Sequence, residues 1–220
     1  FKESEWLADY YLAQQAWYEA ETYILKGLQW FPEDLGMRTR LVDLLLDQGR
    51  KSEAARHLNE LASLAEARAD TKTTTWAMTK ACEIEPQNIE HQRRLAEFQE
   101  RTGDPEAARR TRLNMIRLML DCGMMEDARI LAERIVESAT DDQPLRMEVA
   151  EMFEQAGLPE VSAYHFHQLA RHSLEMGQCE EAKVLARRAL ELKPRHIGAR
   201  ETLIESMLAQ RELKQALNEY

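Results

Sequence analysis

The chain has 220 residues, of which 44% are hydrophobic and 31% charged, and its formal net charge is −10. An acidic chain argues against a general nucleic-acid-binding protein, because contact with the phosphate backbone needs clustered positive charge. The sequence contains no run of about 18 apolar residues and almost no alternating pattern, so it predicts neither a membrane-spanning helix nor a sheet.

The sequence repeats itself with a period of 54 residues. Three consecutive blocks, 35–88, 89–142 and 143–196, align without a gap. A partial fourth block begins at residue 197, and residues 1–34 match the last 34 positions of the same block. A fixed period of this size is typical of repeat proteins, in which successive structural units stack on one another.

The predicted elements are all helices. Within each block, apolar residues recur at i, i+3, i+4 and i+7, which places them on one helix face. Gly49, Gly103 and Gly157 stand where one helix is expected to end, and Pro86 and Pro194 stop another. In chain order, the pattern predicts thirteen helices near 3–14, 17–30, 36–48, 52–68, 71–84, 89–102, 105–121, 124–138, 143–156, 159–175, 179–192, 197–209 and 212–219.

Residues 1–34 carry a set of small and apolar landmarks, Leu7, Ala8, Tyr11, Ala20, Ile24, Gly27 and Pro32. This set resembles the tetratricopeptide repeat (TPR), a 34-residue helix–turn–helix with small residues where its helices cross. The same register starts again at residues 35, 55, 89, 109, 143, 163 and 197. Ser4 stands where the family usually has tryptophan, and Thr74 stands where it has alanine.

The TPR register advances in steps that alternate between 34 and 20 residues. The shorter step makes registers overlap, so one helix serves two repeats and each block holds three helices. The resemblance implies an all-α fold, a single α-solenoid of antiparallel helices (a TPR-like superhelix) over residues 1–220. Because the chain begins and ends inside a block, we expect it to be part of a longer protein.

A local excess of positive charge lies between residues 93 and 117, with seven arginines against four acidic residues. Arg93, Arg94 and Arg101 share one predicted helix, at places that often face the concave groove in this family, and Arg117 holds a comparable place on the next helix. One interpretation is a cradle for the carboxylates of an acidic partner segment. The alternative is a solvated helix face with pairs such as Arg93 and Glu97.

Nine of the fifteen aromatic residues lie within residues 1–31. Tyr11 holds a landmark position and is expected in the core, whereas Trp6 and Tyr10 hold groove-type positions. Exposed tryptophan and tyrosine are favoured anchors for a protein partner. The alternative is that these rings pack against a helix that precedes this stretch in a longer chain.

Catalytic and metal-binding patterns are missing from the sequence. Cys82, Cys122 and Cys179 stand one to a block, which predicts free thiols, buried or half-buried, without a disulfide or metal site. His165 and His172 share a predicted helix at a spacing unsuited to a ligand pair, so a structural or surface role is expected. Without a Gly-rich phosphate loop or nucleophile elbow, we expect no cofactor and no enzyme activity.

The sequence therefore predicts a protein-interaction scaffold that holds a partner segment in a groove lined by successive helices. The expected partner is a protein or peptide, with an acidic segment favoured by the arginines, and neither nucleic acid nor direct membrane insertion is expected. The candidate partner-binding residues are Arg93, Arg94, Arg101, Arg117, Trp6 and Tyr10. The expected compartment is the cytoplasm; the resemblance also implies the alternative of a periplasmic scaffold in a bacterial exopolysaccharide-export, secretion or pilus system.

Overall fold

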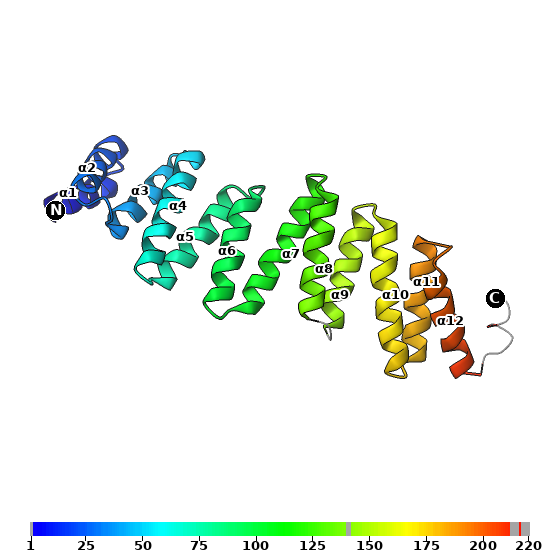
Figure 1. Cartoon of the computed structure of the whole chain (residues 1–220). Helices are drawn as coiled ribbons and strands as arrows, with labels where there is room; N and C mark the ends of the chain where they lie inside the picture. Colours follow the sequence, from blue (N-terminus) through cyan, green and yellow to red (C-terminus); the bar gives the residue numbers. More distant parts are fainter. Residues whose placement is uncertain (1, 140–141, 212–215, 217–220) are drawn as a thin grey trace. The chain divides into compact units, whose positions relative to one another are not determined.

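The computed structural model describes residues 2–139, 142–211 and 216, and these residues form helices joined by turns, without a strand. In chain order, the helices are α1 (Lys2–Ala13), α2 (Trp17–Trp30), α3 (Leu35–Asp47), α4 (Lys51–Ala67), α5 (Thr71–Ile84), α6 (Ile89–Arg101), α7 (Pro105–Asp121), α8 (Met125–Ser138), α9 (Gln143–Gln155), α10 (Pro159–Glu175), α11 (Cys179–Leu192) and α12 (Ile197–Ala209) (Figure 1). The expected all-α fold of TPR-like helical repeats is confirmed, and every helix bound lies within one residue of its predicted place. The expected helix 212–219 lies outside the described residues except for Ala216.

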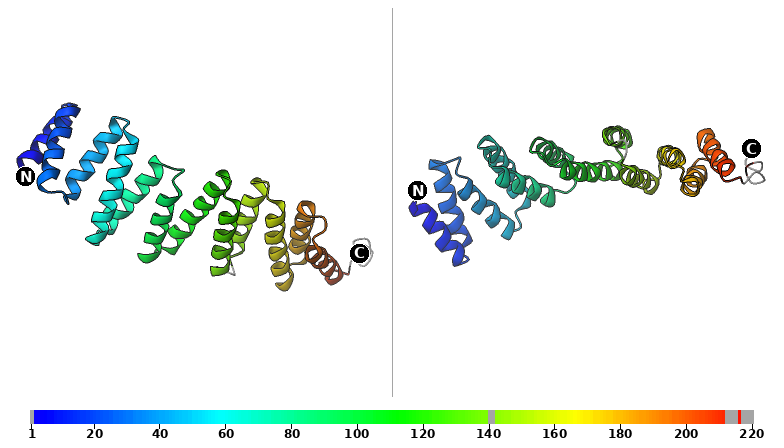
Figure 2. Two further views of the ribbon diagram at one scale, coloured as in Figure 1. Left: turned by 45° about the horizontal axis from the view of Figure 1, so that its top comes forward. Right: turned by 90° about the horizontal axis from the view of Figure 1, so that it is seen from below.

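The chain divides into two compact units, unit 1 (residues 1–112) and unit 2 (residues 113–220), with the division inside α7. In unit 1, α1 to α6 pack in order, each against the next (Figure 2). In unit 2, α8 to α12 do the same, and α10 also contacts α12. The expectation of one solenoid across both units stays a prediction.

Each unit contains a helix that two overlapping repeats share. In unit 1, α4 packs against both α3 and α5, and in unit 2, α10 packs against both α9 and α11. A helix with two neighbours needs two apolar stripes, and α4 supplies them with six fully or nearly fully buried residues, Ala54, Ala55, Leu58, Leu61, Ala62 and Ala65. The 20-residue step in the sequence therefore marks a helix that closes one hairpin and opens the next.

Small residues stand where helices cross. Ala54 of unit 1 and Ser162 of unit 2 occupy the same block position and are both fully buried. The Ser162 Oγ atom donates a hydrogen bond of 2.8 Å to the Ala150 carbonyl oxygen, which satisfies the hydroxyl in the core.

Side-chain caps stabilise the helix starts; for example, Asp34 Oδ1 accepts a hydrogen bond of 2.7 Å from the Met37 amide.

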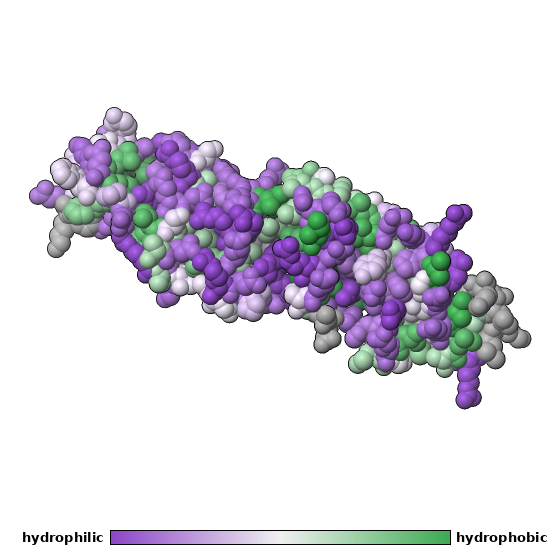
Figure 3. All heavy atoms as spheres, viewed as in Figure 1, coloured by the Kyte–Doolittle hydropathy of each residue, from purple (hydrophilic) through white to green (hydrophobic). Residues whose placement is uncertain are grey.

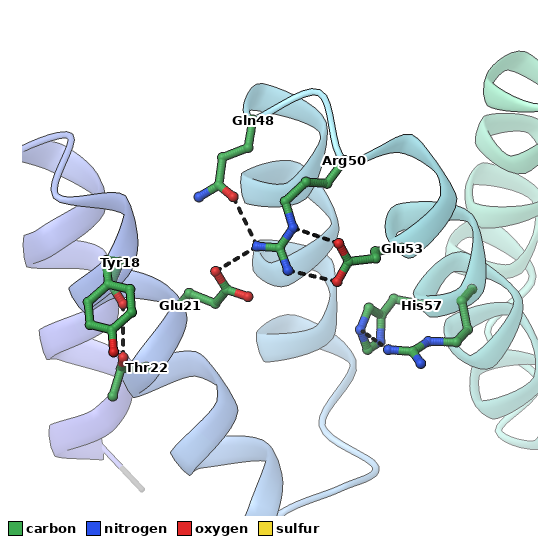
Figure 4. A network of polar contacts seen from close by, with 8 residues as sticks. Tyr18, Glu21, Thr22, Gln48, Arg50, Glu53 and His57 are labelled. Carbon is green, nitrogen blue, oxygen red and sulfur yellow. Dashed lines mark hydrogen bonds and ion pairs between the residues drawn. The ribbon is translucent and has the colours of Figure 1, made fainter.

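An arginine at the turn between α3 and α4 ties three elements together (Figure 4). Arg50 donates to the Glu21 carboxylate of α2 at 2.7 Å and to both oxygens of Glu53 at 2.8 and 2.7 Å. It also donates to Gln48 Oε1 at 3.0 Å. Hydrogen bonds from Arg50 lower the pKa of the Glu53 carboxyl. The network fixes the position of α2 against the hairpin of α3 and α4.

The surface is mainly hydrophilic, and Figure 3 shows hydrophobic residues on the visible face in separate small groups. Among the described helices, none is both long and apolar enough to span a bilayer.

Candidate partner-binding site

The helices that open successive repeats line one pocket in unit 1. The pocket measures about 610 Å³ and is lined by residues of α3, α4 and α6 and of the turn before α3. Its lining residues are Pro32, Glu33, Arg38, Asn59, Glu60, Ser63, Leu64 and Arg94. We call this pocket the unit 1 groove.

One wall of the unit 1 groove is an arginine whose charge is already neutralised. Arg38 is 8% exposed and donates to the Glu60 carboxylate, and also to the Pro32 carbonyl oxygen at 2.7 Å. Its guanidinium lies 3.4 Å from His57 Nδ1. Burial is the main cause that lowers the pKa of His57. Arg38 is a groove residue that the sequence reasoning missed.

The opposite wall carries Arg94, one of the predicted site residues. Its guanidinium donates to Asn59 Oδ1 and to Ser63 Oγ, each at 3.3 Å. Asn59 is itself held by His91, whose Nε2 lies 3.0 Å from Asn59 Nδ2. Among the described residues, no carboxylate forms an ion pair with Arg94. Neutral partners thus fix the guanidinium while its positive charge remains available to a ligand.

Two other predicted arginines of α6 are paired within the chain. Arg93 donates to Glu90 at 2.6 and 2.9 Å and to Glu97 at 2.9 Å, as the solvated-face alternative expects. Arg101 pairs with Glu66 of α4, 35 residues away, and lies over the Phe98 ring at 5.7 Å. Neither residue lines the unit 1 groove, so Arg94 alone of the three does. Their role in partner binding stays a prediction.

Arg117 belongs to unit 2 and is described there. Its Nη2 atom donates to Glu148 Oε1 of α9 at 2.6 Å, and its Nη1 atom lies 3.5 Å from Asn114 Oδ1. The guanidinium therefore joins α7 to α9. A site that Arg117 shares with the arginines of unit 1 stays a prediction.

The aromatic pair on α1 is exposed and stacked. The ring centroids of Trp6 and Tyr10 lie 5.6 Å apart, and the ring planes form an angle of 18°. The exposed fraction is 64% for Trp6 and 45% for Tyr10. Tyr10 meets the edge of Tyr11, and Tyr11 stacks on Tyr23 of α2 at 5.5 Å. The packing positions an aromatic surface at the start of unit 1, and both interpretations of it stay open.

Unit 2 has pockets at corresponding block positions. One, of about 170 Å³, is lined by Gln143 and Arg146 of α9 and by Gln168, Arg171, His172 and Glu175 of α10. Another, of about 310 Å³, lies between α10 and α12 and includes His167 and Gly198. Arg146 follows Arg38, and Arg171 follows Ser63, by two 54-residue periods. The first helices of the repeats therefore line pockets in both units.

The histidine and cysteine side chains differ in burial, and none belongs to a metal-binding cluster within the described ranges. His165 is 1% exposed and stacks on Phe153, and burial, followed by the charge of Arg146, lowers its pKa to about 4. Cys82 is buried and Cys179 half-buried, as expected. The prediction was wrong for Cys122, which is exposed because it follows the end of α7 in the turn. Within the described ranges, no cluster of three metal-ligating side chains occurs.

Neither a protein-family model nor a curated protein matches this sequence. Among solved structures, the TPR2AB domain of yeast Sti1, in its complex with pHSP90, is 13% identical, with 99% of this chain and 87% of that chain covered and a TM-score of 0.46. A tetratricopeptide repeat protein from Parabacteroides merdae is 14% identical, with 94% and 98% covered and a TM-score of 0.27. The TPR domain of P58(IPK) is 12% identical, with 100% and 91% covered and a TM-score of 0.29. These likenesses concern the fold alone.

Proposed function

The chain has a TPR-like helical-repeat fold, and we propose that it is a non-catalytic protein-interaction scaffold. In this proposal, an extended segment of a partner protein lies in the unit 1 groove across α3, α4 and α6. A shared helix such as α4 favours this arrangement, because it presents side chains of two overlapping repeats to one ligand.

The proposal depends on how the Arg94 guanidinium is held in the unit 1 groove. Its guanidinium lines a pocket of about 610 Å³ and is held by Asn59 and Ser63, which are both neutral. A partner carboxylate can accept from the same guanidinium without displacing an internal ion pair. Charge-assisted hydrogen bonds of this kind contribute about 1.5–3 kcal/mol when partly desolvated, against about 0–1 kcal/mol for exposed pairs.

The charge of the whole chain supports an acidic segment as the ligand. With a net charge of −10, most of the surface repels an acidic partner, whereas Arg94, which has no ion pair among the described residues, attracts it in the groove. Trp6 and Tyr10 are proposed as a second contact, since an exposed aromatic stack provides apolar area to a partner.

Fluorescence anisotropy with labelled acidic, neutral and basic peptides tests the proposal. We expect acidic peptides to bind with an affinity that falls as salt rises, and Arg94→Gln to weaken binding about tenfold. The matched control is Arg110→Gln, which removes the same charge from an exposed position of α7 in unit 1. Equal binding of all three peptide classes, or equal losses in the two variants, would contradict the proposal.

A further inference from the structure

The same block position holds an arginine in both units, but only one of the two is neutralised. In unit 1, Arg38 donates to the Glu60 carboxylate. Two periods later, Arg146 takes the place of Arg38, and Gln168 takes the place of Glu60. An amide therefore stands where the first block has a carboxylate. Unlike a carboxylate, which only accepts hydrogen bonds, a glutamine side chain also donates them.

Arg146 is half-buried, and its guanidinium has no hydrogen bond or ion pair with any residue that the structure describes. Burial lowers the pKa of its guanidinium; Tyr164, the one described group that opposes this effect, carries no charge at neutral pH. A desolvated charge without a partner is costly, so this part of unit 2 is incomplete as it stands.

Arg146 lines the pocket of about 170 Å³ between α9 and α10. The pocket is lined by two guanidiniums, those of Arg146 and Arg171, and by the carboxylate of Glu175. Glu175 Oε1 lies 3.5 Å from Arg171 Nη2. One positive charge, that of Arg146, thus remains unmatched. A cavity of about 150 Å³ is large enough to hold a benzene molecule, so a carboxylate or phosphate group fits this one.

We propose that the pocket between α9 and α10 binds one oxyanion, the carboxylate or phosphate group of a ligand, with Arg146 as its main contact. The amide group of Gln168 supplies further donors, and the His172 ring supplies another. The site lies in unit 2 and does not depend on the unit 1 groove, so either can exist without the other.

The experiment follows the arginine side-chain Nε–H signals by NMR in the whole chain. Inorganic phosphate and, separately, acetate are added at constant pH and ionic strength. We expect a saturable shift of the Arg146 signal with at least one of the two anions. Saturation with phosphate alone identifies a phosphoryl ligand, whereas saturation with acetate extends the site to carboxylates.

Two variants and a control decide the assignment. Gln168→Glu restores the carboxylate of the first block, so it should pair with Arg146 and weaken anion binding about tenfold or more. Arg146→Gln should abolish the saturable shifts of neighbouring signals, whereas Arg187→Gln, at an exposed position of α11, should leave the titration unchanged. The proposal is overturned if Arg146 shows no saturable shift, or if Gln168→Glu binds as tightly as the natural chain. Should Arg146→Gln fail to fold, the Gln168→Glu titration decides alone.

Discussion

Ala69 and Gly123 hold the same left-handed backbone conformation one 54-residue block apart, with φ of 56° and 76°. Gln15 and Gly177, one block before and one block after this pair, also have positive φ, at 58° and 75°. The turn after α4 is therefore imposed by the repeat, even where the residue has a side chain. A Cβ atom in this region costs about 1–2 kcal/mol.

Exchanging the two residue types tests this reading of the turn. Ala69→Gly should stabilise the chain by up to about 1 kcal/mol, because the relief of strain exceeds the entropy that glycine adds to the unfolded state. Gly123→Ala should destabilise it by about 1 kcal/mol through backbone strain alone, since no described residue other than the chain neighbours lies within 4 Å of the added Cβ. Urea unfolding measures both changes. A loss of stability in Ala69→Gly would contradict the reading.

The ion pair between Arg38 and Glu60 predicts a larger effect than a surface pair. Glu60→Gln should destabilise unit 1 by about 1–3 kcal/mol, because it leaves a buried guanidinium without its charged partner. The control is Glu83→Gln, which breaks the exposed pair with Lys80 and should cost about 0–1 kcal/mol. Denaturant unfolding of the two variants under one condition makes the comparison, and equal losses would show that burial of Arg38 has no energetic weight.

His165 predicts a pH dependence of stability. Its pKa is about 4 in the folded chain, below the ordinary 6.5, so between these values the unfolded state binds more protons. Stability should fall as pH drops from 6.5 to 4, with His165 contributing at most about 3 kcal/mol of the loss. His165→Leu should remove that share, and unfolding at several pH values measures it.

Other histidines with lowered pKa, such as His57 and His167, also make stability depend on pH, so a smaller slope of stability against pH should persist in His165→Leu. Identical slopes in the natural chain and His165→Leu would show that His165 is not the buried titrating group.

The three cysteines should differ in reactivity. Burial raises the pKa of the Cys82 thiol to about 11, so almost none of it is thiolate at neutral pH. Cys122 is exposed and should react rapidly with a thiol reagent in the native chain, whereas Cys82 should react only after unfolding. Mass spectrometry of the labelled peptides assigns each site. Rapid native labelling of Cys82 would contradict its placement.

Much of the fold can be read from local sequence signals. Gly49 marks the end of α3 because it takes a positive φ, and the apolar spacing between such turns fixes the helix lengths. The double use of α4 follows from the 20-residue step, because a helix in two registers needs two apolar faces. The same turn also forms without glycine, because Arg211 has a φ of 63° at the block position where earlier blocks have glycine.

The candidate site was less predictable, because its chemistry depends on contacts between helices. Arg101 shares its helix with Arg93, but it pairs with Glu66 of α4, 35 residues away in the sequence. Arg38 and Arg146 were not singled out, although arginine recurs at this block position. That recurrence, and the change from Glu60 to Gln168 beside it, is the signal that could have found them.

The most direct test of the scaffold proposal is to locate a bound acidic peptide on unit 1. A photo-crosslinking amino acid is placed at the exposed Glu33 in the groove or, as the control, at the exposed Glu83 of α5. Our account predicts that the peptide crosslinks to the probe at Glu33 and not at Glu83, and that Arg94→Glu abolishes the product. Crosslinking that is equal at the two positions, or unchanged by Arg94→Glu, would contradict it.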